Sequence, residues 1–334
     1  MKYEIYCKQI PFNTGLSKYD ALVPYDDSWS VGDSFETLFN PDKRRRDMIG
    51  PNNVIRKVRI PEGGISDKFD DVPYLLSYVV EGAKDCVLIC PGGAYCDVSV
   101  NDEGIPTAEK LNKMGITAFV LKYRYYPYLY PTAATDCKRA MQWLKAHADE
   151  FGYSKDRISL MGFSAGGNLI LTTGLMYDEL PKDPNYVEDE IDKIDAKPAT
   201  LVPVYAEATA DTFLASIQFG GKIYEDEALA EKLKNEFYLP SHIKKTSPPM
   251  FITDCIDDTV VPVDNSLRLA LACSEVGCKF EIHSFVEGGH GYGSTDHDIP
   301  AIPEFGVAAR DMSGTGEWLR LFTIWMKKVL KDEK

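Results

Sequence analysis

The sequence predicts an α/β protein with one mostly parallel, eight-stranded sheet covered by helices on both faces. From residue 54 onward, apolar runs of strand length alternate with amphipathic stretches of helix length, a pattern typical of strand–helix–strand units. The 334 residues contain no Pro/Ser-rich linker and no internal repeat that would divide them. We therefore expect residues 54–334 to form one domain, and residues 1–53, which lack clear periodicity, to form an N-terminal extension that packs on it.

Eight apolar runs mark the expected strands. In chain order they are VIRKVRI (54–60), YLLSYVV (74–80), CVLIC (86–90), TAFVLKY (117–123), RISLMGF (157–163), ATLVPVY (199–205), PMFITDC (249–255) and KFEIHSF (279–285). The first two runs leave no room for a helix between them, which indicates an antiparallel start. Helical periodicity is clearest in two sets of apolar residues: Cys137, Ala140, Met141 and Leu144, and Trp318, Leu321, Phe322, Trp325, Met326 and Val329.

Two segments interrupt the alternation. Residues 177–198 form an acidic, proline-punctuated insertion, and residues 291–314 form a long polar loop that is rich in proline. In an open parallel sheet, ligands bind at the carboxyl ends of the strands, where such loops gather. Two interpretations of the acidic insertion stay open, the wall of a substrate site and a solvated connector.

Charge and cysteine content narrow the range of partners. The formal net charge of −14 would repel nucleic acid and anionic membrane surfaces at long range, so a neutral substrate fits better. The eight cysteines include no Cys-x-x-Cys pair and no His/Cys spacing typical of zinc. The first 15 residues lack the pattern of a secretory signal, and no apolar run is long enough to cross a membrane. We expect a cytoplasmic protein without a metal or an organic cofactor.

The segment LMGFSAGGN places Ser164 between Gly162 and Gly166, after a strand run and before a helical one. Glycine inside either element costs about 0.5–1 kcal/mol relative to alanine, so this cluster needs a local reason. In this context G-x-S-x-G is typical of a nucleophile elbow, where small neighbours let strand and helix approach closely. Ser164 is therefore a candidate nucleophile, and the Ala165 N–H faces the place where negative charge would develop.

A serine nucleophile needs a base, and the chain offers five histidines. His147 and His242 lie in contexts typical of the surface, and His283 lies inside a strand run. His290, in EGGHGYG, follows the last strand on a glycine-rich loop that can bring an imidazole back over the sheet. We take His290 as the candidate base and His297 as the alternative.

The histidine in turn needs a carboxylate that fixes its tautomer. The segment TDCIDDTVVPVDNS offers four aspartates. Asp254 still belongs to the strand run, and Asp264 is placed to cap the following helix. Asp257 and Asp258 remain, and their spacing does not separate them.

A second oxyanion donor is expected from the loop after an earlier strand. The segment VLICPGGAYCD matches, because its apolar run ends in Pro91-Gly92-Gly93-Ala94. The unhindered backbone N–H groups of this loop can approach a substrate oxygen.

These motifs, in this order, resemble the α/β-hydrolase esterase/lipase family, which includes hormone-sensitive-lipase-like esterases and, more closely, bacterial carbohydrate esterases such as acetyl xylan esterases. The resemblance covers residues 75–330 and rests on CPGGAYCDVSVNDEG, AFVLKYRYYP, PTAATDCKRAMQWL, ISLMGFSAGGNL, PPMFITDCIDDTVVPVDNSL and EGGHGYG. It implies the α/β-hydrolase fold and these site residues: Ser164 as nucleophile, Asp258 as acid, His290 as base, and Gly93, Ala94 and Ala165 as backbone oxyanion donors. The chain departs from many relatives in having Cys90-Pro91-Gly92-Gly93-Ala94 where they have His-Gly-Gly-Gly.

The resemblance implies a serine esterase that hydrolyses short acyl esters, above all acetate, on sugars or oligosaccharides such as acetylated xylan fragments. A serine peptidase, a lipase-like carboxylesterase and a non-catalytic ligand-binding homologue are the alternatives. Tyr95 and Tyr292 are candidate sugar-binding residues, because a phenol ring offers both an apolar face and a hydrogen bond. Core packing is the alternative for the tyrosines of 123–131. The resemblance implies no metal or cofactor, and the oligomeric state stays open.

Overall fold

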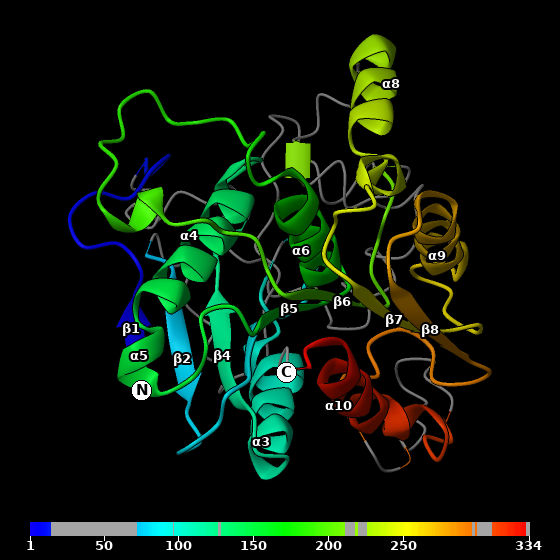
Figure 1. Cartoon of the computed structure of the whole chain (residues 1–334). Helices are drawn as coiled ribbons and strands as arrows, with labels where there is room; N and C mark the ends of the chain where they lie inside the picture. Colours follow the sequence, from blue (N-terminus) through cyan, green and yellow to red (C-terminus); the bar gives the residue numbers. More distant parts are fainter. Residues whose placement is uncertain are drawn as a thin grey trace, which may run out of the picture.

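The computed structural model describes residues 1–14, 72–95, 97–125, 128–210, 218–219, 226–295, 298 and 309–331. An eight-stranded sheet with helices on both faces forms its centre (Figure 1). The strands are β1 (Lys2–Glu4), β2 (Tyr74–Tyr78), β3 (Cys86–Cys90), β4 (Thr117–Lys122), β5 (Ile158–Phe163), β6 (Thr200–Val204), β7 (Met250–Cys255) and β8 (Phe280–Phe285). Their spatial order is β1-β2-β4-β3-β5-β6-β7-β8.

The sheet is antiparallel only at its β1 edge. β2 runs antiparallel to both of its neighbours, β1 and β4, and all other neighbouring strands are parallel. This confirms the predicted, mostly parallel sheet. The partner of β2 at the edge is Lys2–Glu4, a strand that the sequence pattern did not predict; the predicted strand 54–60 lies outside the described residues.

Helices cover both faces of the sheet. In Figure 1, α4, α6 and α9 lie on one face, and α3 and α10 lie on the other. The two periodic segments of the sequence fall in α4 and α10 as predicted. The helices are α3 (Ile105–Lys113), α4 (Thr132–Ala146), α5 (Ala148–Phe151), α6 (Ala165–Met176), α8 (Glu227–Glu236), α9 (Asp264–Val276) and α10 (Trp318–Val329), with the short turns η3 (Val100–Gly104), η4 (Ile191–Lys193), η6 (Leu239–His242) and η8 (Thr315–Glu317).

The strands β3 to β7 are buried along their whole length. Because helices cover both faces, these strands appear in the sequence as continuous apolar runs and not as an alternating pattern. The parallel strands β3, β5, β7 and β8 end at the same edge of the sheet. The loops that follow these four strands therefore meet at one place.

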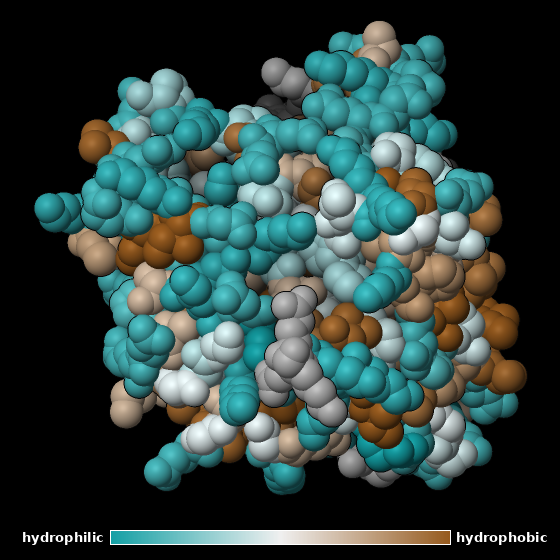
Figure 2. All heavy atoms as spheres, in the orientation of Figure 1, coloured by the Kyte–Doolittle hydropathy of each residue, from teal (hydrophilic) through white to brown (hydrophobic). Residues whose placement is uncertain are grey.

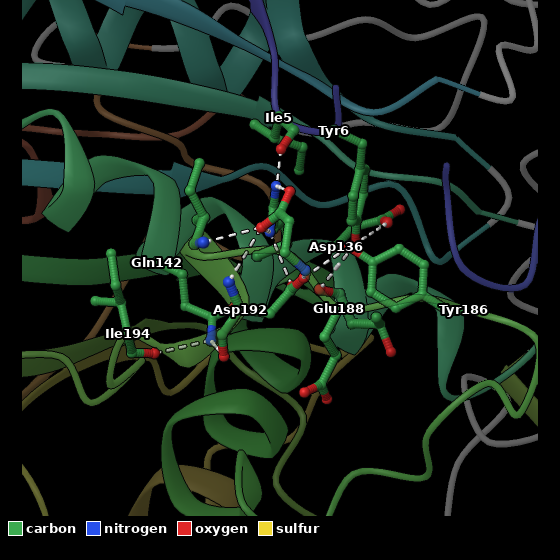
Figure 3. A network of polar contacts seen from close by, with 12 residues as sticks. Ile5, Tyr6, Asp136, Gln142, Tyr186, Glu188, Asp192 and Ile194 are labelled. Carbon is green, nitrogen blue, oxygen red and sulfur yellow. Dashed lines mark hydrogen bonds and ion pairs between the residues drawn. The ribbon is translucent and has the colours of Figure 1, made fainter. Parts of the chain in front are cut away.

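Arg139 on α4 holds the N-terminal segment and the acidic insertion together. Its Nε donates to the Ile5 carbonyl oxygen at 2.8 Å, and its two terminal nitrogens donate to the Asp189 carboxylate at 2.7 Å each. The hydrogen bond from Arg139 lowers the pKa of Asp189 to about 2. The Asp192 carboxylate forms a further ion pair with the same guanidinium (Figure 3). The insertion 177–198 is therefore anchored to α4, and both interpretations of it, a substrate wall and a solvated connector, stay predictions.

A second buried arginine, Arg124, also binds the N-terminal segment. Arg124 pairs with Asp136 at 2.6 Å, with both side chains fully buried, and also donates to the Pro11 carbonyl oxygen at 2.8 Å. The Tyr6 ring packs against the Arg139 guanidinium, and its hydroxyl donates to Asp136 (Figure 3). Residues 1–14 are thus bound to the helix layer as well as to the sheet. The boundary expected between residues 53 and 54 lies outside the described residues.

The surface is mainly hydrophilic on the face drawn in Figure 2. Hydrophobic side chains gather at its right-hand edge, over α9 and β8, where Leu267 and Leu271 of α9 are 51% and 60% exposed. Among the described helices, none combines the length and the apolar character that a membrane span requires.

Candidate active site

Ser164 occupies a sharp turn between β5 and α6. Its backbone has φ 51° and ψ −117°, a conformation that residues other than glycine rarely adopt. A Cβ at Gly162 would lie 2.1 Å from the Gly166 carbonyl oxygen, and a Cβ at Gly166 would lie 2.1 Å from the Cys90 carbonyl oxygen. The glycines around Ser164 are therefore required because β3, β5 and α6 approach so closely here that no Cβ fits.

His290 lies directly against the serine. Its Nε2 is 2.8 Å from Ser164 Oγ, and its Nδ1 is 2.7 Å from Asp258 Oδ2. Ser164 and Asp258 are almost buried, at 8% and 5% exposure. The three side chains come from the loops after β5, β8 and β7, so the sheet brings together residues that lie far apart in the chain.

The two adjacent aspartates have different partners. Asp258 uses one oxygen for His290 and accepts the N–H groups of Val260 and Val261 on the other, at 2.8 and 3.0 Å. Asp257 accepts the N–H groups of Gly288 and Gly289 at 3.3 and 2.8 Å, and it is exposed. The structure therefore pairs Asp258 with the imidazole, and Asp257 braces the glycine loop that carries it.

The other histidines are placed away from this line of hydrogen bonds. His283 Nε2 is 2.9 Å from a Glu281 carboxylate oxygen. His147 and His242 are hydrogen-bonded to backbone carbonyl oxygens near their own positions in the chain. His297 lies outside the described residues.

The backbone N–H groups predicted to bind an oxyanion belong to the loop after β3 and to the first residue of α6. Gly93 and Ala94 have φ of 122° and 53°, and Ala165 is the first residue of α6. Within the described part of the chain, no protein acceptor is assigned to the N–H of Gly93, Ala94 or Ala165. These are the three predicted oxyanion donors, and the N-terminus of α6 adds a favourable dipole.

Glu103 on η3 is a further residue at this site. One of its carboxylate oxygens accepts the Gly92 N–H at 2.5 Å, and the other accepts the Tyr205 hydroxyl at 2.8 Å. Burial raises the pKa of the Glu103 carboxyl, and these two hydrogen bonds oppose the shift. Glu103 was not predicted as a site residue, because the polar run in which it stands is typical of an exposed loop.

The two tyrosines expected to bind sugar are buried. Tyr95 is 3% exposed and donates its hydroxyl to Asn168 at 2.9 Å. Tyr292 is fully buried, with its hydroxyl 3.1 Å from Thr253 Oγ1. A side chain without accessible surface cannot touch a sugar, so the expectation for Tyr292 is corrected: its ring packs against the Tyr205 ring, at a centroid distance of 4.5 Å.

The described residues contain no group of three or more His, Cys, Asp or Glu side chains arranged to hold a metal ion. The side chains that the structure brings together here are a hydroxyl, an imidazole and a carboxylate, joined by hydrogen bonds in that order.

Comparisons with known proteins place this chain in a family. The model of the BD-FAE family matches residues 75–272. Endo-1,4-beta-xylanase B of Butyrivibrio fibrisolvens is 29% identical over 66% of this chain, and the acetylxylan esterase of Xylanibacter ruminicola is 26% identical over 61%. The chain spans only 34% and 40% of the length of these two relatives.

Solved structures share the fold over most of the chain. The acetyl ester-xyloside bifunctional hydrolase of Caldicellulosiruptor lactoaceticus matches with a TM-score of 0.62 and 28% identity, and the match covers 77% of this chain and 88% of that one. MGS-M1, an α/β hydrolase from a deep-sea metagenome library, matches with a TM-score of 0.56 and 22% identity over 78% of this chain and 93% of its own. The chain therefore has the α/β-hydrolase fold and belongs to the BD-FAE family.

Proposed function

We propose that this chain is a carboxylic ester hydrolase in which Ser164 is the nucleophile, His290 the general base and Asp258 the acid that orients it. One observation carries the proposal: the continuous line of hydrogen bonds from Ser164 Oγ through the imidazole to Asp258, with steps of 2.8 and 2.7 Å. A serine hydroxyl becomes a good nucleophile only when an adjacent base removes its proton.

The reaction proceeds in two steps through an acyl-enzyme. Ser164 Oγ attacks the ester carbonyl carbon while His290 Nε2 takes the hydroxyl proton, and the Nδ1–H of the resulting imidazolium donates to Asp258. The carbonyl oxygen becomes an oxyanion that accepts hydrogen bonds from the N–H groups of Gly93, Ala94 and Ala165. His290 returns the proton to the leaving alcohol. Water, activated by the same imidazole, then releases the acid and restores the serine.

Short acyl esters of sugars, above all acetates, are the proposed substrates. This rests on the relatives, since one is named an acetylxylan esterase and another an acetyl ester-xyloside hydrolase. The net charge of −14 is compatible with a neutral acetylated oligosaccharide.

The mechanism is tested by Ser164→Ala with p-nitrophenyl acetate as substrate. Because the triad acts as a unit, we expect kcat to fall by about 10⁶-fold. EDTA should leave the activity of the parent protein unchanged. Near-normal turnover by Ser164→Ala would refute the serine mechanism, and loss of activity in EDTA with recovery in zinc would indicate metal catalysis.

The substrate class is tested by a panel. Acetate release from acetylated xylo- and manno-oligosaccharides is compared with hydrolysis of p-nitrophenyl octanoate and of an aminoacyl arylamide. We expect the acetylated oligosaccharides to give the highest kcat/KM. Preference for the octanoate would assign a lipase-like enzyme, cleavage of the arylamide would assign a peptidase, and no turnover of any substrate would favour a ligand-binding homologue.

A further inference from the structure

Glu103 is buried beside Gly92, the residue that separates it from Ser164, and it does not belong to the triad. It is 7% exposed, and a Cβ placed on Gly92 would lie 2.9 Å from Glu103 Oε2 and 3.1 Å from Ser164 Cβ. The same oxygen accepts the Gly92 N–H. Gly92 therefore has its N–H occupied inside the protein, and the next two N–H groups of the loop, at Gly93 and Ala94, are the ones left for an oxyanion.

Tyr205 connects this carboxylate with the loop that carries the histidine. It stands directly after β6 with φ of 36°, a positive value that a tyrosine adopts only under restraint. Its hydroxyl donates to Glu103 Oε1 at 2.8 Å and accepts the Gly293 N–H at 3.1 Å. Its ring packs against the His290 ring at a centroid distance of 4.9 Å.

We propose that Glu103 and Tyr205 form a positioning pair that fixes the oxyanion loop and the histidine loop relative to each other. The inference rests on the proposed serine mechanism and deepens it. Neither residue belongs to the triad or to the N–H groups assigned to the oxyanion. Each acts through others: Glu103 through the Gly92 N–H, and Tyr205 through the Gly293 N–H and the imidazole ring.

A carboxylate fits this position because two donors meet on its two oxygens. The Gly92 N–H cannot reverse its role, and the Tyr205 oxygen already accepts from Gly293, so its proton needs an acceptor. A glutamine would present one acceptor oxygen and one NH₂ group. It would therefore lose one of the two contacts, whichever way its amide is turned.

A displacement of the oxyanion N–H groups or of the imidazole affects the transition state more than the bound ester. A misplacement on the order of 1 Å costs about 10²-fold in rate. The pair should therefore influence kcat and leave KM nearly unchanged. A purely structural role would lower stability and leave the turnover of the folded enzyme intact.

The experiment compares Glu103→Gln, Tyr205→Phe and the double variant with the parent protein, using p-nitrophenyl acetate. Tyr153→Phe is the matched control, because Tyr153 is also buried and donates its hydroxyl to a backbone oxygen, that of Leu144, at 2.8 Å. All variants are assayed at a temperature and urea concentration where unfolding curves show them fully folded.

We expect kcat to fall about 10²-fold in each single variant, with KM within about threefold of the parent. The double variant should lose little more than either single variant, since the Tyr205–Glu103 hydrogen bond is the link between the two loops and either substitution weakens it. Tyr153→Phe should keep its kcat. If Glu103→Gln does not fold, Tyr205→Phe alone still tests the pair.

Full kcat in folded Glu103→Gln and Tyr205→Phe would overturn the inference, as would losses that multiply in the double variant. Either result leaves the proposed function untouched as long as Ser164→Ala is inactive. An active Ser164→Ala protein would instead refute the mechanism on which the pair depends.

Discussion

Adjacent carboxylates after β7 have separate tasks at the residue scale, and substitution can separate them. Asp258→Asn keeps the shape of the side chain but no longer favours the tautomer with a proton on His290 Nδ1. We expect kcat for p-nitrophenyl acetate to fall by about 10⁴-fold. Asp257→Asn should lose less than about tenfold, because it disturbs only hydrogen bonds to the backbone of the glycine loop. A larger loss in Asp257→Asn would reassign the acid.

The sequence was informative about residues whose roles depend on order along the chain. Ser164 and His290 could be proposed because each follows a recognisable strand on a glycine-rich turn. Spacing alone could not separate Asp257 from Asp258, because both follow the same strand and only the direction of each side chain differs; the family resemblance implied Asp258. Glu103 and Tyr205 could not be found, since their hydrogen bonds to each other and to Gly293 join parts of the chain that are about 90 residues apart or more, and only the fold brings them together.

At the scale of elements, a buried ion pair connects α4, which carries Asp136, with Arg124 in the loop after β4. Arg124 also donates to the Pro11 carbonyl oxygen, so it holds residues 1–14 at the same place. Arg124→Met would leave the Asp136 carboxylate buried without its cation. We expect the free energy of unfolding in urea to fall by about 3–5 kcal/mol. The control is Lys145→Met, which removes a pair whose aspartate, Asp195, is 60% exposed; it should cost less than about 1 kcal/mol. Equal losses in both variants would contradict a special role for the buried pair.

Elements differ in how strongly the sequence marks them. The buried strands β3 and β5 are visible as unbroken apolar runs, because both of their faces meet helices. β1 was missed because it is a three-residue edge strand whose pairing depends on β2 and not on a pattern of its own. The acidic insertion also gave no sign that its carboxylates pair with Arg139, since a partner on α4 cannot be deduced from local composition.

For the whole molecule, the net charge of −14 should slow the association of anionic substrates relative to neutral ones. We compare kcat/KM for p-nitrophenyl acetate with that for the acetate ester of 4-hydroxybenzoate, which is anionic. Between about 20 and 200 mM salt, the value for the anionic ester should rise several-fold as repulsion is screened, and the value for the neutral ester should stay constant. A fall for the anionic ester would reveal a local positive field at the site.

The positive φ of Ser164 has a consequence for how the protein could change under selection. A strained backbone of this kind costs about 1–3 kcal/mol, and a glycine would release most of it. Ser164→Ala and Ser164→Gly both lack the hydroxyl, so their comparison isolates the backbone. We expect the free energy of unfolding of the glycine variant to exceed that of the alanine variant by about 1 kcal/mol, after the greater freedom of unfolded glycine is included. The glycine variant should therefore unfold at a higher urea concentration. Equal midpoints would mean that the turn is unstrained. A higher midpoint for glycine would mean that a search for heat-resistant variants, made without an activity screen, favours inactive molecules at this position.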